Sequence, residues 1–168
     1  MFFLANVGII ELVSNYEEWS DFSMSTYKQI IVAVDGSDEA KEAFNKAVAI
    51  AVRNEGAALH LANIIDTRSY AAVEAYDRSI VERAQKHAEE LLEEYREKAL
   101  AEGVKNVEAH VKYGSPKTMI SRDLSDELEA DLIVCGATGL NRVERFLIGS
   151  VSESIVRSAT CDVLVVRS

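Results

Sequence analysis

Hydrophobic and polar residues follow two alternating patterns along this chain from residue 27 onward. In the first pattern, short runs are almost entirely apolar and rich in Val, Ile, Leu and Ala, and one run alternates between apolar and polar residues. Such runs are typical of strands in a buried sheet. Together with the turn residues that close some of them, they predict five strands over 29–37, 58–66, 107–114, 130–136 and 161–167.

In the second pattern, apolar residues recur every three or four positions, which is the spacing of one face of a helix. Four helices are therefore expected, over 37–56, Tyr76–Glu102, 115–128 and Ser150–Ser158. Ser37 is placed to cap the first of these helices, and Gly56 ends its segment. Pro116 falls in the first turn of the third helix, where its missing N–H group is not needed.

The order of these elements predicts the fold class. Apolar strands that alternate with helices form α/β folds, in which a parallel sheet carries helices on both faces. We therefore expect an open five-stranded parallel sheet of the Rossmann-like type. Ligands of such sheets bind beyond the carboxyl ends of the strands, where the strand order reverses. The turn 35–37 and the loop at Gly136 each follow a strand directly, so we expect them to meet at one cleft.

The loop after the fourth predicted strand carries the clearest candidate chemistry. Gly136 and Gly139 lack a Cβ atom, so the backbone there can adopt positive φ and let a ligand approach closely. Gly149 precedes Ser150, which together with Glu153 fits the capping-box pattern S-x-x-E. The first N–H groups of the helix that begins there carry a partial positive charge and can bind an anion.

The segment between Gly139 and Gly149 contains Asn141, Arg142 and Arg145 and is long enough to surround several phosphates. The lysine-containing pattern G-x-x-x-x-G-K-[ST] and the dinucleotide pattern G-x-G-x-x-G are both absent from the sequence. Glycines that only turn the chain and cap the helix are the alternative interpretation. Three glycines after the fourth strand, the last of which opens a helix, favour phosphate binding.

Composition and charge narrow the classes of partner. The 168 residues suffice for one domain, and 48% of them are hydrophobic. The net charge of −10 disfavours nucleic acid and anionic membranes as main partners, because both require a basic face. No run reaches the roughly 18 apolar residues of a membrane-spanning helix.

The cysteines and histidines lack the spacing of a metal site. Cys135 and Cys161 lie far apart in apolar contexts, and the histidines (His60, His87 and His110) are scattered along the sequence. We therefore expect no metal site made of protein side chains alone. The cysteines are interpreted as buried, reduced thiols of a cytoplasmic protein.

Residues 1–23 differ in composition from the rest of the chain. They contain four acidic residues, no Lys or Arg, and five of the twelve aromatic residues. A signal peptide begins with a positive region, so this segment does not resemble one. We expect a flexible extension, left by cloning or by an upstream start, ahead of a single domain at 24–168. A short docking segment whose aromatic side chains cover a neighbouring surface is the alternative.

These residues together resemble a known family. The stretch GATGLNRVERFLIGS (136–150) fits G-x2-G-x9-G-[ST], which is similar to the ATP-binding signature of the universal stress protein family. The resemblance covers 27–167 and includes YKQIIVAVDGSDEA, NIID, VKYGSP and DVLVV. It implies one universal stress protein domain with an adenine nucleotide alpha hydrolase-like fold. The chain departs from the family at Ala137 and Thr138, where members often carry His or a second Ser.

The resemblance also implies which residues bind ATP. Ala33, Val34 and Asp35 would lie beside the adenosine, with Asp35 accepting a hydrogen bond from the base or ribose, and Ile64 would line the adenine pocket. The ribose and phosphates would be surrounded by Gly136, Ala137, Gly139, Asn141, Arg142, Gly149, Ser150, Val151 and Ser152. Serine hydroxyls would donate to phosphate oxygens, and Mg²⁺ or Mn²⁺ would be held through the phosphates.

Three of these residues have simpler interpretations. Asp35 can be a turn former, Ser150 a helix cap, and Arg142 a solvated loop charge.

These expectations favour an ATP-binding regulatory or stress-response protein. Hydrolysis needs a positioned base, and Glu144 is the only acid inside the loop, so we expect ATP to be held rather than hydrolysed. A slow ATPase and a nucleotide-free interaction module are the alternatives. The last strand, Asp162–Arg167, is expected at a sheet edge, where the resemblance implies a two-fold homodimer. A downstream protein partner, which the sequence does not identify, is also expected.

Overall fold

A computed structural model describes residues 27–66, 68, 79–140 and 148–167 of the chain. Five strands form one sheet in the order β3-β2-β1-β4-β5, and every neighbouring pair is parallel. The strands are β1 (Gln29–Ala33), β2 (Ala58–Ile65), β3 (Asn106–Tyr113), β4 (Leu132–Gly136) and β5 (Asp162–Val166). The predicted fold class, an open five-stranded parallel sheet, is therefore confirmed. The last strand lies at a sheet edge, as the sequence predicts.

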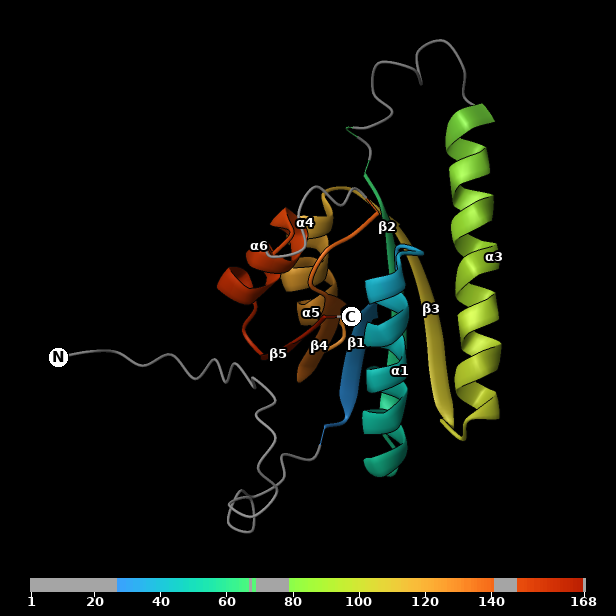
Figure 1. The fold of residues 1–168 in the computed structure, drawn as a ribbon, viewed down its shortest axis with the longest axis vertical. Coiled ribbons are helices and arrows are strands. Elements are labelled where there is room, and N and C mark those ends of the chain that lie inside the picture. The colour runs from blue at the N-terminus through green and yellow to red at the C-terminus, as the bar shows by residue number, and fades with distance from the viewer. Residues whose placement is uncertain (1–26, 67, 69–78, 141–147, 168) are drawn as a thin grey trace, which may run out of the picture.

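Helices cover the sheet in two layers, one on each face (Figure 1). Helices α1 (Asp38–Arg53) and α3 (Ser79–Ala101) pack on one face, where Phe44 and Tyr95 make an edge-to-face contact with ring centroids 4.6 Å apart. The second face carries α4 (Pro116–Thr118), the π-helical segment η2 (Met119–Asp123), α5 (Leu124–Glu127) and α6 (Ser150–Ser158). The central strands of the sheet are apolar on both faces because helices cover both faces.

The order of the strands in the sheet reverses direction once along the chain. From β1 the chain adds β2 and then β3 on one side, and it then crosses to add β4 and β5 on the other side. The neighbouring strands β1 and β4 therefore form the switch point, where the crossing connections leave space for a ligand at the carboxyl ends of the strands.

Local signals account for several helix ends. Ser37 caps α1 as predicted, because its Oγ accepts a hydrogen bond from the Ala40 N–H at 3.2 Å. Pro116 occupies the first turn of α4, as its missing N–H group suggests. The predicted start of the long helix at residues 76–78 lies outside the described residues, as does the predicted extension 1–23.

The third predicted helix is not α-helical throughout. Its middle, Met119–Asp123, is π-helical. Within it the Ser121 hydroxyl donates to the Lys117 carbonyl at 2.7 Å, a side-chain bond that competes with the regular backbone pattern. In the described part of the chain, no helix has both the length and the apolar character that crossing a membrane requires.

Candidate functional site

A cavity of about 430 Å³ opens at the carboxyl ends of β1, β2 and β4. Its position is the switch point of the sheet, where open α/β folds bind ligands. Its volume falls within the range of roughly 300–1,000 Å³ that is typical of small-molecule sites. Position and size therefore suit a small organic ligand.

The structure brings most of the predicted site residues together at this cavity. Those that line it are Ala33, Val34, Asp35, Ile64, Gly136, Gly139, Gly149, Ser150, Val151 and Ser152. Ala137 is instead buried, and its carbonyl accepts a hydrogen bond from the Gly149 N–H at 2.7 Å. Asn141 and Arg142 lie outside the described residues.

Other lining residues were not predicted from the sequence. They are Ala40, Ala62, Asn63, Asp66, Pro116, Ile120, Cys135, Thr138 and Leu140. Asn63 and Asp66 lie at the carboxyl end of β2, so the rule that singled out the other strand ends would have found them. Pro116 and Ile120 reach the cavity because the third helical segment packs beside α6, which no local pattern reveals.

The end of β1 is held by side-chain hydrogen bonds. Asp35 Oδ1 accepts from the backbone N–H of Ser37 at 2.9 Å and from its hydroxyl at 2.6 Å. The Asn63 side chain donates to the Val34 carbonyl at 2.7 Å and so ties β1 to β2. Asp35 is therefore both a turn former and a residue of the cavity wall.

The glycines of the loop allow close packing, and Gly136, Gly139 and Gly149 do not use the positive φ that glycine permits. Positive φ occurs at other glycines: Gly36, Gly56, Gly103 and Gly114. A Cβ atom on Gly136 would lie 2.7 Å from Glu39 Cβ, and one on Gly139 would lie 2.7 Å from Asp35 Oδ2. The missing side chains thus allow the loop to approach α1 and the end of β1.

The predicted capping box at the start of α6 is wrong. Gly149 is the N-cap, no side chain caps the helix, and Ser150 is its first helical residue. The helix begins at this position because two hydrogen bonds hold Gly149. Its N–H donates to the Ala137 carbonyl at 2.7 Å, and its carbonyl accepts from the Glu153 N–H at 2.9 Å. The next three residues line the cavity, and their N–H groups have no acceptor within the helix. They therefore form a candidate anion site.

Ser152 and Thr138 differ in whether their hydroxyl groups are already bonded within the protein. Ser152 Oγ is buried and donates to the carbonyls of Gly136 at 2.7 Å and Ala137 at 3.1 Å, so its single hydrogen holds the loop together. Thr138 lines the cavity, and among the described residues its buried Oγ1 has no hydrogen-bond partner. Thr138 is thus better placed than Ser152 to bond a ligand.

The charged groups in the described part of the cavity wall are the carboxylates of Asp35 and Asp66. Asp66 accepts two hydrogen bonds from the Arg68 side chain, at 3.0 Å from Nε and 2.7 Å from Nη2, and a third from the Arg68 backbone N–H at 3.0 Å, and these bonds lower the pKa of the Asp66 carboxyl. In the described part of the wall, the charge of Asp66 is thus paired with that of Arg68, and the carboxylate of Asp35 has no cationic partner. A phosphate bound here would need the α6 N–H groups and a cation to offset that charge.

A parallel sheet with one switch point and a cavity at the carboxyl ends of its strands define an open α/β fold of the Rossmann-like type. The model of the universal stress protein family matches residues 26–167, so the chain belongs to this family. A protein of Staphylococcus haemolyticus that is named as a universal stress protein is 56% identical over 145 residues, which are 86% of this chain and 87% of that protein. The resemblance that the motifs indicate is therefore confirmed.

Solved structures of the family share the fold. UspA of Lactobacillus plantarum superposes with a TM-score of 0.75 and 32% identity, covering 85% of this chain and 99% of its own. A universal stress protein in complex with cAMP (TM-score 0.64, 29% identity) covers 85% of this chain and 98% of its own. The protein of Archaeoglobus fulgidus in complex with dAMP (TM-score 0.61, 27% identity) covers 84% and 99%.

Proposed function

We propose that this chain binds ATP in the switch-point cavity and acts as a nucleotide-dependent regulatory protein of the stress response. The observation that carries the proposal is the start of α6, where three residues whose N–H groups have no acceptor within the helix line a cavity at the ends of β1 and β4. Two related structures carry adenine nucleotides, cAMP and dAMP, which supports adenine as the base.

Each part of the nucleotide has a matching part of the wall. Ile64, Ala33 and Val34 offer apolar surface for the adenine ring. Asp35 has its Oδ2 near Gly139 and free of the Ser37 bonds, so it can accept from a ribose hydroxyl. The phosphates would then lie against the start of α6, with the Thr138 hydroxyl as a further donor. Mg²⁺ or Mn²⁺ bound to the phosphates would reduce their repulsion from the Asp35 carboxylate.

A titration of thermal stability tests this proposal. A ligand that binds only the folded state at 100 times its Kd stabilises by about 2.7 kcal/mol, so ATP with Mg²⁺ should raise Tm. Asp35→Asn should weaken the effect of ATP. Asp126→Asn, an exposed acid on α5, is the matched control and should leave it unchanged. No rise in Tm with ATP would instead favour a nucleotide-free interaction module.

Whether the nucleotide is held or hydrolysed is a separate question for the same site. We expect the protein to hold ATP and to release ADP only with a partner protein. Single-turnover measurements on the ATP-loaded chain should show no steady release of phosphate. Unaided turnover would identify a slow ATPase and would contradict the switch.

The proposal includes a homodimer formed through β5. This strand is an edge of the sheet, so its outer backbone groups can pair with a second copy. Sedimentation at micromolar concentration should find a dimer, and a monomer would refute this pairing. The free thiols of Cys135 and Cys161 agree with the proposed reducing, cytoplasmic setting.

A further inference from the structure

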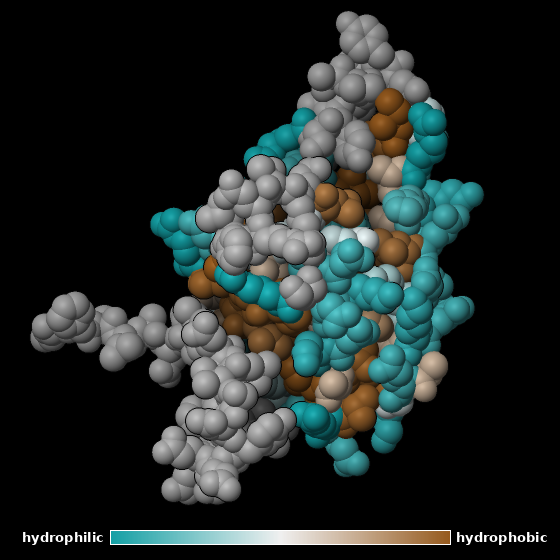
Figure 2. Space-filling model, viewed as in Figure 1, coloured by the Kyte–Doolittle hydropathy of each residue, from teal (hydrophilic) through white to brown (hydrophobic). Residues whose placement is uncertain are grey.

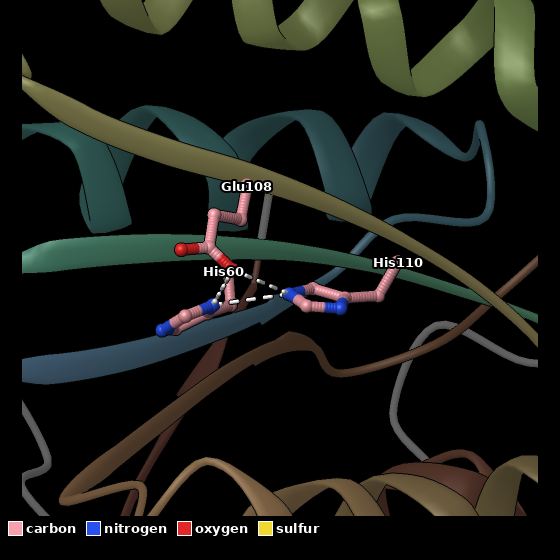
Figure 3. Close-up of side chains that lie close together, drawn as sticks. All are labelled: His60, Glu108 and His110. Carbon is pink, nitrogen blue, oxygen red and sulfur yellow. Dashed lines mark hydrogen bonds and ion pairs between the residues drawn. The ribbon is translucent and has the colours of Figure 1, made fainter.

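Two histidines that are 50 residues apart in sequence meet on the face of the sheet opposite α3. His60 lies in β2 and His110 in β3, and the parallel register places His60 beside Glu108. Figure 3 shows the two imidazole rings facing each other, with the Glu108 carboxylate to one side and within reach of both. The three side chains each offer one ligand atom, and these atoms all lie within 4.8 Å of one another. His60 and His110, although scattered along the sequence, are therefore close together in space.

The spacing of the three atoms suits one small metal ion. His60 Nδ1 lies 3.0 Å from His110 Nε2, and Glu108 Oε2 lies 3.7 Å from the first nitrogen and 3.8 Å from the second. Zinc bonds of about 2.0–2.1 Å in a tetrahedron separate neighbouring ligand atoms by about 3.3 Å. Shifts of roughly half an ångström therefore convert this triangle into one face of a zinc site.

A neighbouring side chain orients the first histidine. His60 Nε2 lies 2.8 Å from Gln29 Oε1, so its N–H can donate to that oxygen and leave the Nδ1 lone pair directed at the other two groups. This is the outer hydrogen bond that metal-binding histidines usually make.

One side of the cluster is open to solvent and acidic. The Glu108 side chain is 61% exposed, whereas that of His60 is 4% exposed, so an ion can reach the buried nitrogens from the Glu108 side. A hollow of about 670 Å³ beside His60 and Glu108 is also lined by the acids Asp126, Glu127 and Glu129. Lys105 lines it too, and Lys112 pairs with Glu127 at 3.1 Å, so the acids still outnumber the lysines.

We propose that His60, Glu108 and His110 form a binding site for Zn²⁺, with a water molecule as the fourth ligand. Two imidazoles and one carboxylate are typical zinc ligands, whereas Mg²⁺ and Ca²⁺ prefer oxygen ligands alone. The bound ion would join the edge strand β3 to β2. This site is separate from the nucleotide cavity, since none of its three residues lines that cavity.

Zinc titration of the full chain tests the proposal, with nucleotide removed and Mg²⁺ in excess. Competition against a zinc-chelating dye should find one ion per chain. Gln29→Leu should weaken binding by about 10- to 100-fold because it removes the outer hydrogen bond. His110→Gln and Glu108→Gln should weaken it at least as much. His87→Gln is the matched control, because His87 is exposed on α3 and should bind no ion.

Nuclear magnetic resonance of the wild-type imidazoles locates the ion without any variant. Zinc should shift the signals of His60 and His110 and leave that of His87 unchanged. Circular dichroism checks that each variant is folded, and His60 is left intact because it is buried. Equal zinc affinity in wild type and His110→Gln, or unchanged His60 and His110 signals, would show that the pair is only a hydrogen-bonded contact and would overturn the proposal.

Discussion

Replacing Gly136 with alanine tests the packing role that the structure assigns to the first glycine of the loop. The added Cβ would lie 2.7 Å from Glu39 Cβ and 2.9 Å from the Glu39 carbonyl carbon. Since non-bonded carbons prefer about 3.5–4.0 Å, the end of β4 and α1 must separate by on the order of an ångström. Overpacking of this kind costs about 1–3 kcal/mol. For a chain of this size the expected fall in Tm is roughly 2–12 °C.

The loss of stability in Gly136→Ala can be measured by thermal and urea unfolding, with circular dichroism as the signal. Gly139→Ala is the matched comparison, because its added Cβ meets a movable atom, Asp35 Oδ2, at 2.7 Å rather than helix backbone. It should cost less stability than Gly136→Ala and should instead disturb the Asp35 carboxylate. A Gly136→Ala protein as stable as wild type, or more stable than Gly139→Ala, would refute the packing argument.

Two further substitutions test single hydrogen bonds. Ser152→Ala should lower the free energy of unfolding by about 1–3 kcal/mol in urea titrations, because buried carbonyls lose their donor, and an unchanged value would contradict this. Tyr27 donates to Asp162 Oδ2 at 2.9 Å, and burial together with this bond raises its pKa from 10.0 to about 12. The neutral phenol is thus favoured in the folded state, so its contribution is complete below pH 10 and is lost as the pH rises toward 12. Tyr27→Phe should reduce the fall in stability over that window, and equal falls in the two proteins would contradict the assignment.

The fold was predictable because each of its signals is local. Apolar runs mark the strands, helical spacing marks the helices, and Ser37 caps α1 through a bond to a residue only three positions away. The start of α6 could not be predicted in the same way. There a long-range bond from Gly149 to Ala137 decides which residue is the N-cap, and it overrides the local pattern of Ser150 and Glu153.

The two candidate sites differ in the same way, because local signals predict the first and long-range pairing forms the second. Asp35 and Gly136 follow their strands directly, so the topology rule alone predicts that they meet. The cluster of His60, Glu108 and His110 depends on the register between β2 and β3, which pairs His60 with Glu108. The alternating pattern of β3 specifies which residues share a face, but a shift of two residues would keep that face and move Glu108 away from His60, and the sequence pattern does not exclude it.

Isothermal titration of the nucleotide-free chain with ATP and Mg²⁺ tests the central claim most directly. We predict one ATP per chain, weaker binding without Mg²⁺ because the Asp35 carboxylate lies in the cavity wall, and much weaker binding of GTP. At protein concentrations in the tens of micromolar, the titration detects a Kd of that order, which corresponds to a binding free energy of about −6 to −7 kcal/mol. If ATP then gives no more heat than buffer, nucleotide binding at this site is contradicted.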